Sequence, residues 1–339
     1  MMEWNEEKAQ QIVGKYKKRF SWRFSLKVIR VVAAIIFLYF IYMMIISIAF
    51  NSGSGGKRVE FYQKLAIDWT YPEVSSGISM SQVHEITPFL TQKIEIPLTR
   101  RIGNEDYVVS ELTLSKRLFS TLSHVEIEKN YPYSSSESKF YFNLPYYLNS
   151  DRKLKGSESP QVWSKLEKIH EGNVADLAFS TDEYYSPKEI IELISAYDLD
   201  ITWMPLYMGE NERFTGVGWG WGDDSMRIDS PWGLSGARVI DKQFGSGYLA
   251  KSLDSSSVED SEKAMLDNMQ MMLKDNKKLA EVLLNTQNLQ ERYDYLHDEG
   301  FQAYGAVVTG PVKELLKLKD IKEIRSVQLG EITYWNWEK

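Results

Sequence analysis

The most distinct pattern in the chain is a run of 20 residues, 31–50, without a single charged side chain. Its only polar members are Tyr39, Tyr42 and Ser47. A helix rises 1.5 Å per residue, so such a run extends about 30 Å, the thickness of the hydrocarbon core of a bilayer. The apolar part of a cleaved signal peptide is shorter, at about 7–15 residues. The run therefore predicts a retained transmembrane helix at residues 31–50.

Before this run, apolar residues recur every three or four positions, which predicts an amphipathic helix within residues 3–27. Two functions fit such a helix: it lies on anionic lipid, or it docks on a cytoplasmic partner. For docking, we expect Ile12, Tyr16 and Phe20 to be the apolar anchors. Lys18 and Arg19 occupy the other faces, where they would meet an acidic partner or lipid.

The charge of the chain is unevenly distributed. Residues 1–30 contain eight Lys or Arg and three Asp or Glu, whereas the rest of the chain contains 32 and 44. Basic residues next to a membrane span favour the cytoplasmic side. We therefore expect a basic cytoplasmic arm at residues 1–30 and an extracytoplasmic region at residues 51–339. Residues 51–57, rich in Gly and Ser, predict a flexible linker between the span and that region.

The fold class expected outside the membrane is α+β. In residues 58–155, apolar and polar positions alternate at 93–98, 107–114, 124–128 and 139–144, which predicts a β-rich unit of antiparallel strands. A Ser-rich and charged stretch at 149–159 is the candidate boundary to a second unit, residues 156–339.

The second unit is expected to contain two β-α-β repeats. The first has a strand at 174–180, a helix whose start at Ser186 has a capping-box pattern, and a strand at 201–207. The second has strands at 301–309 and 324–335 around a helix that starts at Pro311. A further helix is expected after Ser159, as its cap, and Pro160. With the helical stretch 258–299 between the repeats, a ferredoxin-like arrangement is one possible topology.

The composition excludes several kinds of chemistry. The chain has no Cys and only four His, so thiolate metal sites, Cys nucleophiles and His-based metal sites are not expected. A net charge of −7 argues against direct binding of nucleic acid. No set of residues combines a nucleophile, a base and an oxyanion site, and we expect neither a catalytic activity nor a cofactor. A surface hydrolase using Asp223, Asp224 or His297 is the least favoured alternative.

Residues 209–247 show no periodicity that predicts regular structure. A loop of this length in a compact domain is often functional. Its Gly residues alternate with aromatic residues and precede a pair of carboxylates, but they lack the strand and helix that flank a phosphate-binding loop. We expect this loop to be a sensing surface, with five candidate residues: Trp219, Trp221, Asp223, Asp224 and Trp232.

Several longer stretches resemble one known family. The C-terminal ones are 292–300 (RYDYLHDEG), 304–314 (YGAVVTGPVKE), 327–331 (VQLGE) and 334–337 (YWNW), and the N-terminal ones are 4–8 (WNEEK) and 15–19 (KYKKR) before the span. They resemble the bacterial sigma factor regulator family. Its members are single-pass anti-sigma factors of extracytoplasmic-function sigma factors in Bacillus and its relatives. The resemblance covers most of the chain and is strongest over residues 160–337.

The resemblance implies a membrane-anchored anti-sigma factor, with the sigma factor held at the cytoplasmic arm and an envelope signal received by the outer region. The arm here has only about 30 residues. It would bind sigma by its helix alone or together with a second small membrane subunit. The alternative is an extracytoplasmic sensor or binding module that is anchored in the membrane and has no sigma-sequestering activity of its own.

Overall fold

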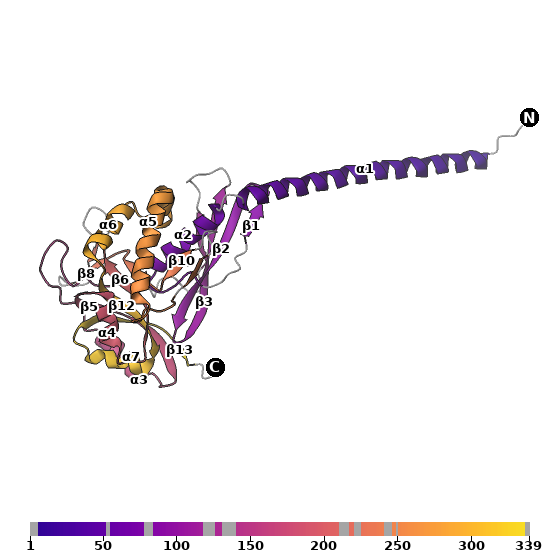
Figure 1. Ribbon diagram of the computed structural model, residues 1–339. Coiled ribbons are helices and arrows are strands. Elements are labelled where there is room, and N and C mark those ends of the chain that lie inside the picture. The colour runs from indigo at the N-terminus through magenta and orange to yellow at the C-terminus, as the bar shows by residue number, and fades with distance from the viewer. Residues whose placement is uncertain are drawn as a thin grey trace, which may run out of the picture.

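The computed structural model describes residues 6–51, 55–77, 84–117, 126–130, 140–209, 217–219, 225–240, 246–248 and 250–335. Helix α1, Glu6–Asn51, projects from the body of the protein as one continuous rod of 46 residues (Figure 1). Its segment Phe24–Phe50 is long and apolar enough to cross a membrane, and its side chains are almost all exposed. The predicted span at 31–50 lies within this segment.

The next element differs from the prediction. Residues 55–70 form helix α2, Gly55–Thr70, where the end of a linker and the start of a β-rich unit were predicted. Every residue from 61 to 69 is buried, including Lys64, which pairs with Glu60 at 2.7 Å. A helix buried on all sides carries no apolar stripe, so its periodicity is not visible in the sequence.

A four-stranded antiparallel sheet follows, in the order β1-β2-β3-β4. Its strands are β1, His84–Thr87, β2, Thr91–Ile102, β3, Glu105–Arg117, and β4, Glu126–Asn130. Side chains along β2 alternate between buried and less buried positions, as expected of a strand with one face on the core. The strands predicted at 93–98 and 107–114 are confirmed, and β4 overlaps the one predicted at 124–128.

The strand predicted at 139–144 is absent in its described part, residues 140–144. Phe140, Phe142 and Leu144 are buried as the alternation suggested. However, the backbone here is bonded mainly by side chains: Asn143 N–H donates to Ser180 Oγ at 2.9 Å. The Arg325 guanidinium donates to the carbonyl of Leu144 at 2.9 Å and to that of Leu154. These contacts replace the ladder that a neighbouring strand would supply.

The C-terminal half is built around a five-stranded sheet of order β13-β5-β12-β6-β9. Its strands are β5, Asn173–Tyr185, β6, Asp200–Tyr207, β9, Trp232–Ser235, β12, Gln302–Pro311, and β13, Ile324–Tyr334. All neighbouring strands are antiparallel. Helix α4, Pro187–Ile194, connects β5 to β6, and α7, Val312–Lys317, with the short 3₁₀ turn η1, Leu318–Asp320, connects β12 to β13. The two predicted β-α-β repeats are therefore present and interlocked, which is compatible with a ferredoxin-like arrangement.

The helix starts agree with the sequence in one case and differ in another. Ser186 and Glu189 form the predicted capping box at α4, with both reciprocal hydrogen bonds. Helix α3, Pro160–Lys168, begins at Pro160 as predicted, but Ser159 makes no capping bond with its side chain. Ser159 is in the left-handed region at φ 51°, where its hydroxyl is not in position to accept from the first turn. Ser159 is therefore the N-cap residue of α3 as predicted, but its side chain does not supply the capping hydrogen bond.

The helical stretch between the repeats consists of α5, Val258–Leu283, and α6, Leu289–Glu299. Helix α5 is kinked at Asn276, whose backbone angles are φ −156° and ψ 78°. The Asn276 side chain accepts a hydrogen bond from the Leu279 N–H at 3.1 Å, which caps the second half of the helix. In Figure 1, α5 and α6 lie above the five-stranded sheet, and α3, α4 and α7 lie together below it.

The region 209–247 contains short strands where no regular structure was expected. Besides β9, they are β7, Val217–Trp219, β8, Met226–Ile228, β10, Arg238–Ile240, and β11, Ser246–Tyr248. The pairs β7–β8 and β10–β11 are antiparallel hairpins of three residues per strand. Three or four residues are too few to show an alternation in the sequence, which is why the prediction was wrong here.

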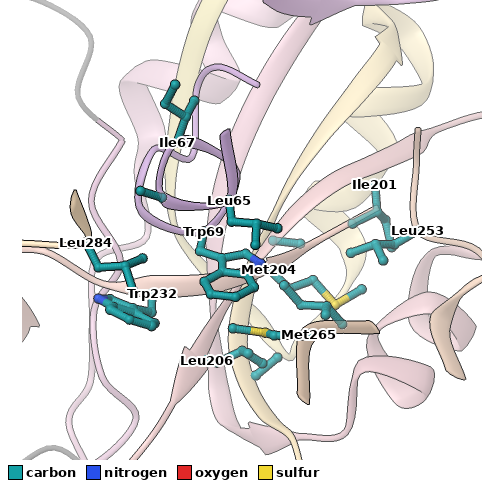
Figure 2. Close-up of a cluster of buried hydrophobic side chains, with 14 of the residues drawn as sticks. Leu65, Ile67, Trp69, Ile201, Met204, Leu206, Trp232, Leu253, Met265 and Leu284 are labelled. Carbon is teal, nitrogen blue, oxygen red and sulfur yellow. The ribbon is translucent and has the colours of Figure 1, made fainter. Parts of the chain in front are cut away.

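One large cluster of buried side chains includes residues from α2, the four-stranded sheet, the five-stranded sheet and α3 to α7. Figure 2 shows Leu65 and Trp69 of α2 among side chains of β6, β9 and α5. Helix α2, the first described element after α1, therefore lies in the middle of the part of the protein that follows α1. A movement of α2 relative to the sheets would disturb this core.

Candidate functional site: the arm of α1 and the buried Asp68–Arg238 cluster

The predicted docking residues all lie on α1. Ile12 and Tyr16 are 52% and 72% exposed, so both are free to contact a partner. Lys18, Arg19 and Phe20 belong to the same continuous helix, but their side chains are outside the described residues. Because α1 runs without a break from Glu6 to Asn51, these positions are connected to the membrane segment by helical backbone alone.

The predicted sensing residues fall into two groups. Trp221, Asp223 and Asp224 lie outside the described residues, as does the side chain of Trp219, whose backbone is in β7. Trp232, by contrast, is only 3% exposed, and its ring lies 6.0 Å from that of Trp69 on α2 (Figure 2). The expectation that Trp232 lies on a sensing surface is corrected, because it is a core residue of β9.

A buried ion pair that was not predicted from the sequence joins residues 209–247 to α2. Asp68 near the end of α2 accepts a hydrogen bond from Arg238 Nε at 2.7 Å, and both side chains are at most 3% exposed. Asp68 also accepts from the N–H and the hydroxyl of Ser76, at 2.8 and 2.9 Å, and from the Tyr248 hydroxyl at 3.1 Å. We call these four residues the Asp68–Arg238 cluster.

Further contacts hold Arg238 in place. Its guanidinium lies 3.9 Å from the centre of the Tyr248 ring and donates to Ser76 Oγ at 2.7 Å. The Arg238 carbonyl accepts from the Asn268 side chain of α5 at 2.8 Å. Burial is the largest single influence on Arg238 and by itself would lower its pKa, but the attraction and hydrogen bonds of Asp68 and Tyr248 together outweigh it and raise that pKa. Burial raises the pKa of Tyr248, and the charge of Asp68 raises it further. At neutral pH the cluster therefore contains a charged Arg and a neutral Tyr.

The cluster connects the membrane-proximal helix to the region predicted to sense a signal. Asp68 belongs to α2, while Arg238 and Tyr248 belong to the hairpin β10–β11. The two charges are 170 positions apart in the sequence, so no local pattern relates them. Only the composition offered a hint, since a lone charge within an otherwise apolar stretch such as 65–69 is expected to find a partner.

A second set of contacts joins α2 to α5 beside its kink. Arg58 pairs with Asp275 at 3.0 Å, and the Tyr62 hydroxyl donates to the same carboxylate at 2.8 Å. Burial raises the pKa of Tyr62, and its bond to Asp275 adds to the effect. Asp275 directly precedes Asn276, the residue at which α5 bends. Charged groups therefore bind α2 to α5 near its start and to β10 near its end.

Among the described residues, no group of three or more His, Asp or Glu side chains is placed to hold a metal ion. The arrangement instead provides an exposed helix, a membrane segment and a charged buried connection between α2 and β10–β11.

Comparison with known proteins identifies the family. The model of the sigma factor regulator N-terminal region matches residues 10–107, and that of the sigma factor regulator C-terminal region matches residues 166–331. The chain belongs to the sigma factor regulator family. Sigma factor regulators act on transcription through a protein partner, and the resemblance found in the sequence is confirmed.

A curated relative is similar to this sigma factor regulator over most of its length. The probable anti-sigma-M factor YhdL of Bacillus subtilis (strain 168) is 24% identical over 298 residues, which cover 84% of this chain and 73% of the relative. No solved structure matches the chain. The N-terminal family match begins at residue 10, within the exposed arm of α1, and extends through the span, α2 and β2.

Proposed function

We propose that this protein is a membrane-anchored anti-sigma factor that restrains an extracytoplasmic-function sigma factor and relays a cell-envelope signal. The observation that carries the proposal is the match of both the N-terminal and the C-terminal regions to sigma factor regulators, on one chain with an apolar helix between arm and outer region. The similarity to a probable anti-sigma-M factor supports it.

In this proposal the N-terminus is cytoplasmic and the region after α1 is extracytoplasmic. The excess of basic residues before the span supports this orientation. The arm then presents Ile12, Tyr16 and Phe20 to the sigma factor, with Lys18 and Arg19 beside them. Because the arm is short, a second small membrane subunit is a candidate to complete the sigma-binding surface.

The signal would reach the arm through α2. Residues 209–247 include the hairpin strand β10, which the Asp68–Arg238 cluster joins to α2. A ligand or a change in the envelope that displaces β10–β11 would weaken this buried pair and allow α2 to shift against α1. Helix α1 would carry the shift to the arm, because a continuous helix transmits rotation and translation along its axis.

The proposal is tested by a pull-down from solubilised membranes. We expect the full-length protein to retain a sigma factor, and a variant with Ile12→Ala, Tyr16→Ala and Phe20→Ala to lose it, because the apolar anchors are gone. The matched control is Gln10→Ala with Gln11→Ala, two exposed polar residues of the same helix, which should retain the sigma factor. Transcription from a sigma-dependent promoter should rise with the triple variant and stay unchanged with the control.

If the triple variant still retains a sigma factor, together with a small membrane protein, the sigma-binding element is that second subunit and not the arm. Absence of any sigma factor from all three samples would contradict the proposal. The protein would then be the alternative, a membrane-anchored sensor or binding module without sigma-sequestering activity.

A further inference from the structure

The hairpin β1–β2 has an apolar tip that lies against the membrane helix. The Tyr42 hydroxyl of α1 donates a hydrogen bond to the Pro88 carbonyl at 2.7 Å. The tip, residues 87–91 (TPFLT), carries no charge, and Phe89 within it is 88% exposed. Figure 1 shows β1 and β2 beside the end of α1 that joins the body of the protein. Among the described residues, Phe89 is the most exposed of the large apolar side chains.

The position of Tyr42 along α1 determines how deep in the membrane this tip lies. Tyr42 comes 12 residues after Arg30, the last charged residue before the apolar run, so the two are about 18 Å apart along the helix axis. The hydrocarbon core of a bilayer is about 30 Å thick. If Arg30 is at one surface of this core, Tyr42 and the Pro88 that it contacts lie inside the core, about 12 Å short of its other surface.

Placing Tyr42 at the surface of the hydrocarbon core would instead bury charged side chains in the bilayer. If the hydrocarbon core ended at Tyr42, the 20 residues needed to cross it would extend back to Arg23 and would place Lys27 and Arg30 within the bilayer. Each charge in the middle of a span costs about 2.5–3.5 kcal/mol. One face of the last turns of α1 is also covered by protein, since Ile46 and Phe50 are 3% and 5% exposed, whereas Ile45 and Ile48 on the other faces are 57% exposed. The outer region therefore reaches along α1 to the depth of Tyr42.

The charges of the hairpin agree with such a depth. Behind the uncharged tip, Glu85 and Lys93 face each other across the two strands, and both are exposed. On the other side of β2, the exposed Arg117 of β3 lies opposite Thr91. An apolar tip bordered by charged side chains is the distribution expected of a hairpin that crosses from water into lipid, because long basic side chains beside a buried segment extend to the headgroups. The tip would sit in lipid, and the charged pair would remain at the headgroups.

We propose that residues 87–91 insert into the leaflet that surrounds the C-terminal end of α1 and bind lipid through Phe89 and Leu90. The hairpin is then a second membrane contact of the outer region. It also connects lipid to the core, because Arg100 on the same strand β2 forms a buried ion pair with Asp176 of β5 at 2.7 Å. The inference requires α1 to span the membrane and is independent of any sigma factor.

The absence of Cys from the chain makes the test direct, because a single introduced Cys carries a unique label. The full-length variants Phe89→Cys and Val108→Cys are labelled with the fluorophore NBD and placed in nanodiscs of phosphatidylglycerol and phosphatidylethanolamine. Val108 is the matched control, a 64% exposed apolar residue of β3 opposite Thr99. Thr99 is eight residues beyond Thr91, so Val108 is about 26 Å from the tip along the sheet.

We expect the emission of the label at position 89 to be blue-shifted relative to position 108, and to be quenched by doxyl-labelled lipid but not by iodide. The label at position 108 should be quenched by iodide but not by doxyl-labelled lipid. Emission at 89 that matches 108 and is quenched by iodide would show a tip in water and overturn the proposal. Protection at 89 from both quenchers would also overturn it, in favour of a protein partner in the membrane.

Discussion

At the scale of single residues, the most consequential feature is the buried pair of Asp68 and Arg238. Removing two charges from water costs several kcal/mol, and their attraction repays this only when the remaining donors and acceptors are bonded. Here Ser76 and Tyr248 provide those bonds. The pair is therefore sensitive to the loss of either member, since the other would be left as an unpaired buried charge.

Arg238→Met is expected to lower the free energy of unfolding by about 3–5 kcal/mol, because it leaves the Asp68 carboxylate without its cation. The combination with Asp68→Asn should cost less than the sum of the two single changes. The measurement is urea unfolding of the full-length protein in detergent, followed by tryptophan fluorescence.

The matched control is Lys153→Met, which removes an exposed partner of Glu183. Pairs at the surface contribute about 0–1 kcal/mol, so this change should have little effect. Equal effects of Arg238→Met and Lys153→Met would contradict the importance given to the buried cluster.

At the scale of elements, hydrogen bonds at the helix ends determine where several helices start and bend. The capping box of Ser186 and Glu189 begins α4, and Asn276 restarts α5 after its kink. Hydrogen bonds from the backbone and side chain of Ser186 lower the pKa of Glu189. A carboxylate with a lowered pKa stabilises the folded state at pH values above its ordinary pKa and loses this effect as the pH falls.

Ser186→Ala is expected to lower the free energy of unfolding by about 0.5–2 kcal/mol, the usual effect of losing an N-cap side chain. The stability difference between the wild type and Glu189→Ala should be largest near neutral pH and should shrink as the pH falls through about 4, where glutamate is protonated. Thermal unfolding at a series of pH values measures it. A difference that stays constant over this range would show that the charge of Glu189 plays no part in the cap.

At the scale of the whole molecule, α2 contacts both of the units that were predicted from the sequence. The division into residues 58–155 and 156–339 stays a prediction, but α2 and both sheets contribute to one cluster of buried side chains. The pair Arg100–Asp176 joins β2 to β5, and Arg58–Asp275 joins α2 to α5. Helix α2 therefore packs against both sheets and α5 in one core.

This arrangement predicts that residues 156–339 are unstable as a separate fragment. Without α2, the faces of β9 and α5 that cover Trp69 and Leu65 would be exposed to water. We expect fragment 156–339 to bind a hydrophobic dye and to melt without a cooperative transition, and fragment 55–339, which lacks only the arm and the span, to melt cooperatively. Circular dichroism and dye binding measure both. Cooperative melting of the two fragments at the same temperature would contradict a shared core.

The features predicted correctly from the sequence are those set by neighbouring residues. The apolar run within α1, the alternation in β2 and β3, the capping box at Ser186 and the separate helices and strands of the two β-α-β repeats are visible in short stretches of sequence. The pairing of those strands, such as β5 with β12 and β13, joins distant positions. The family resemblance came from whole stretches of residues. The candidate sensing residues were identified from the sequence, but their burial was not predicted, and Trp232 is part of the core.

The sequence by itself therefore determined the membrane segment, the order of most helices and strands, and the family. Only the tertiary structure decided that residues 55–70 form a central helix, that Asp68 pairs with Arg238 across 170 positions, and that the tip of β1–β2 lies at the depth of Tyr42. The physical reason is the range of the interactions. Periodicity and caps depend on neighbours in the chain, whereas burial on all sides and the pairing of distant charges exist only once the chain has folded.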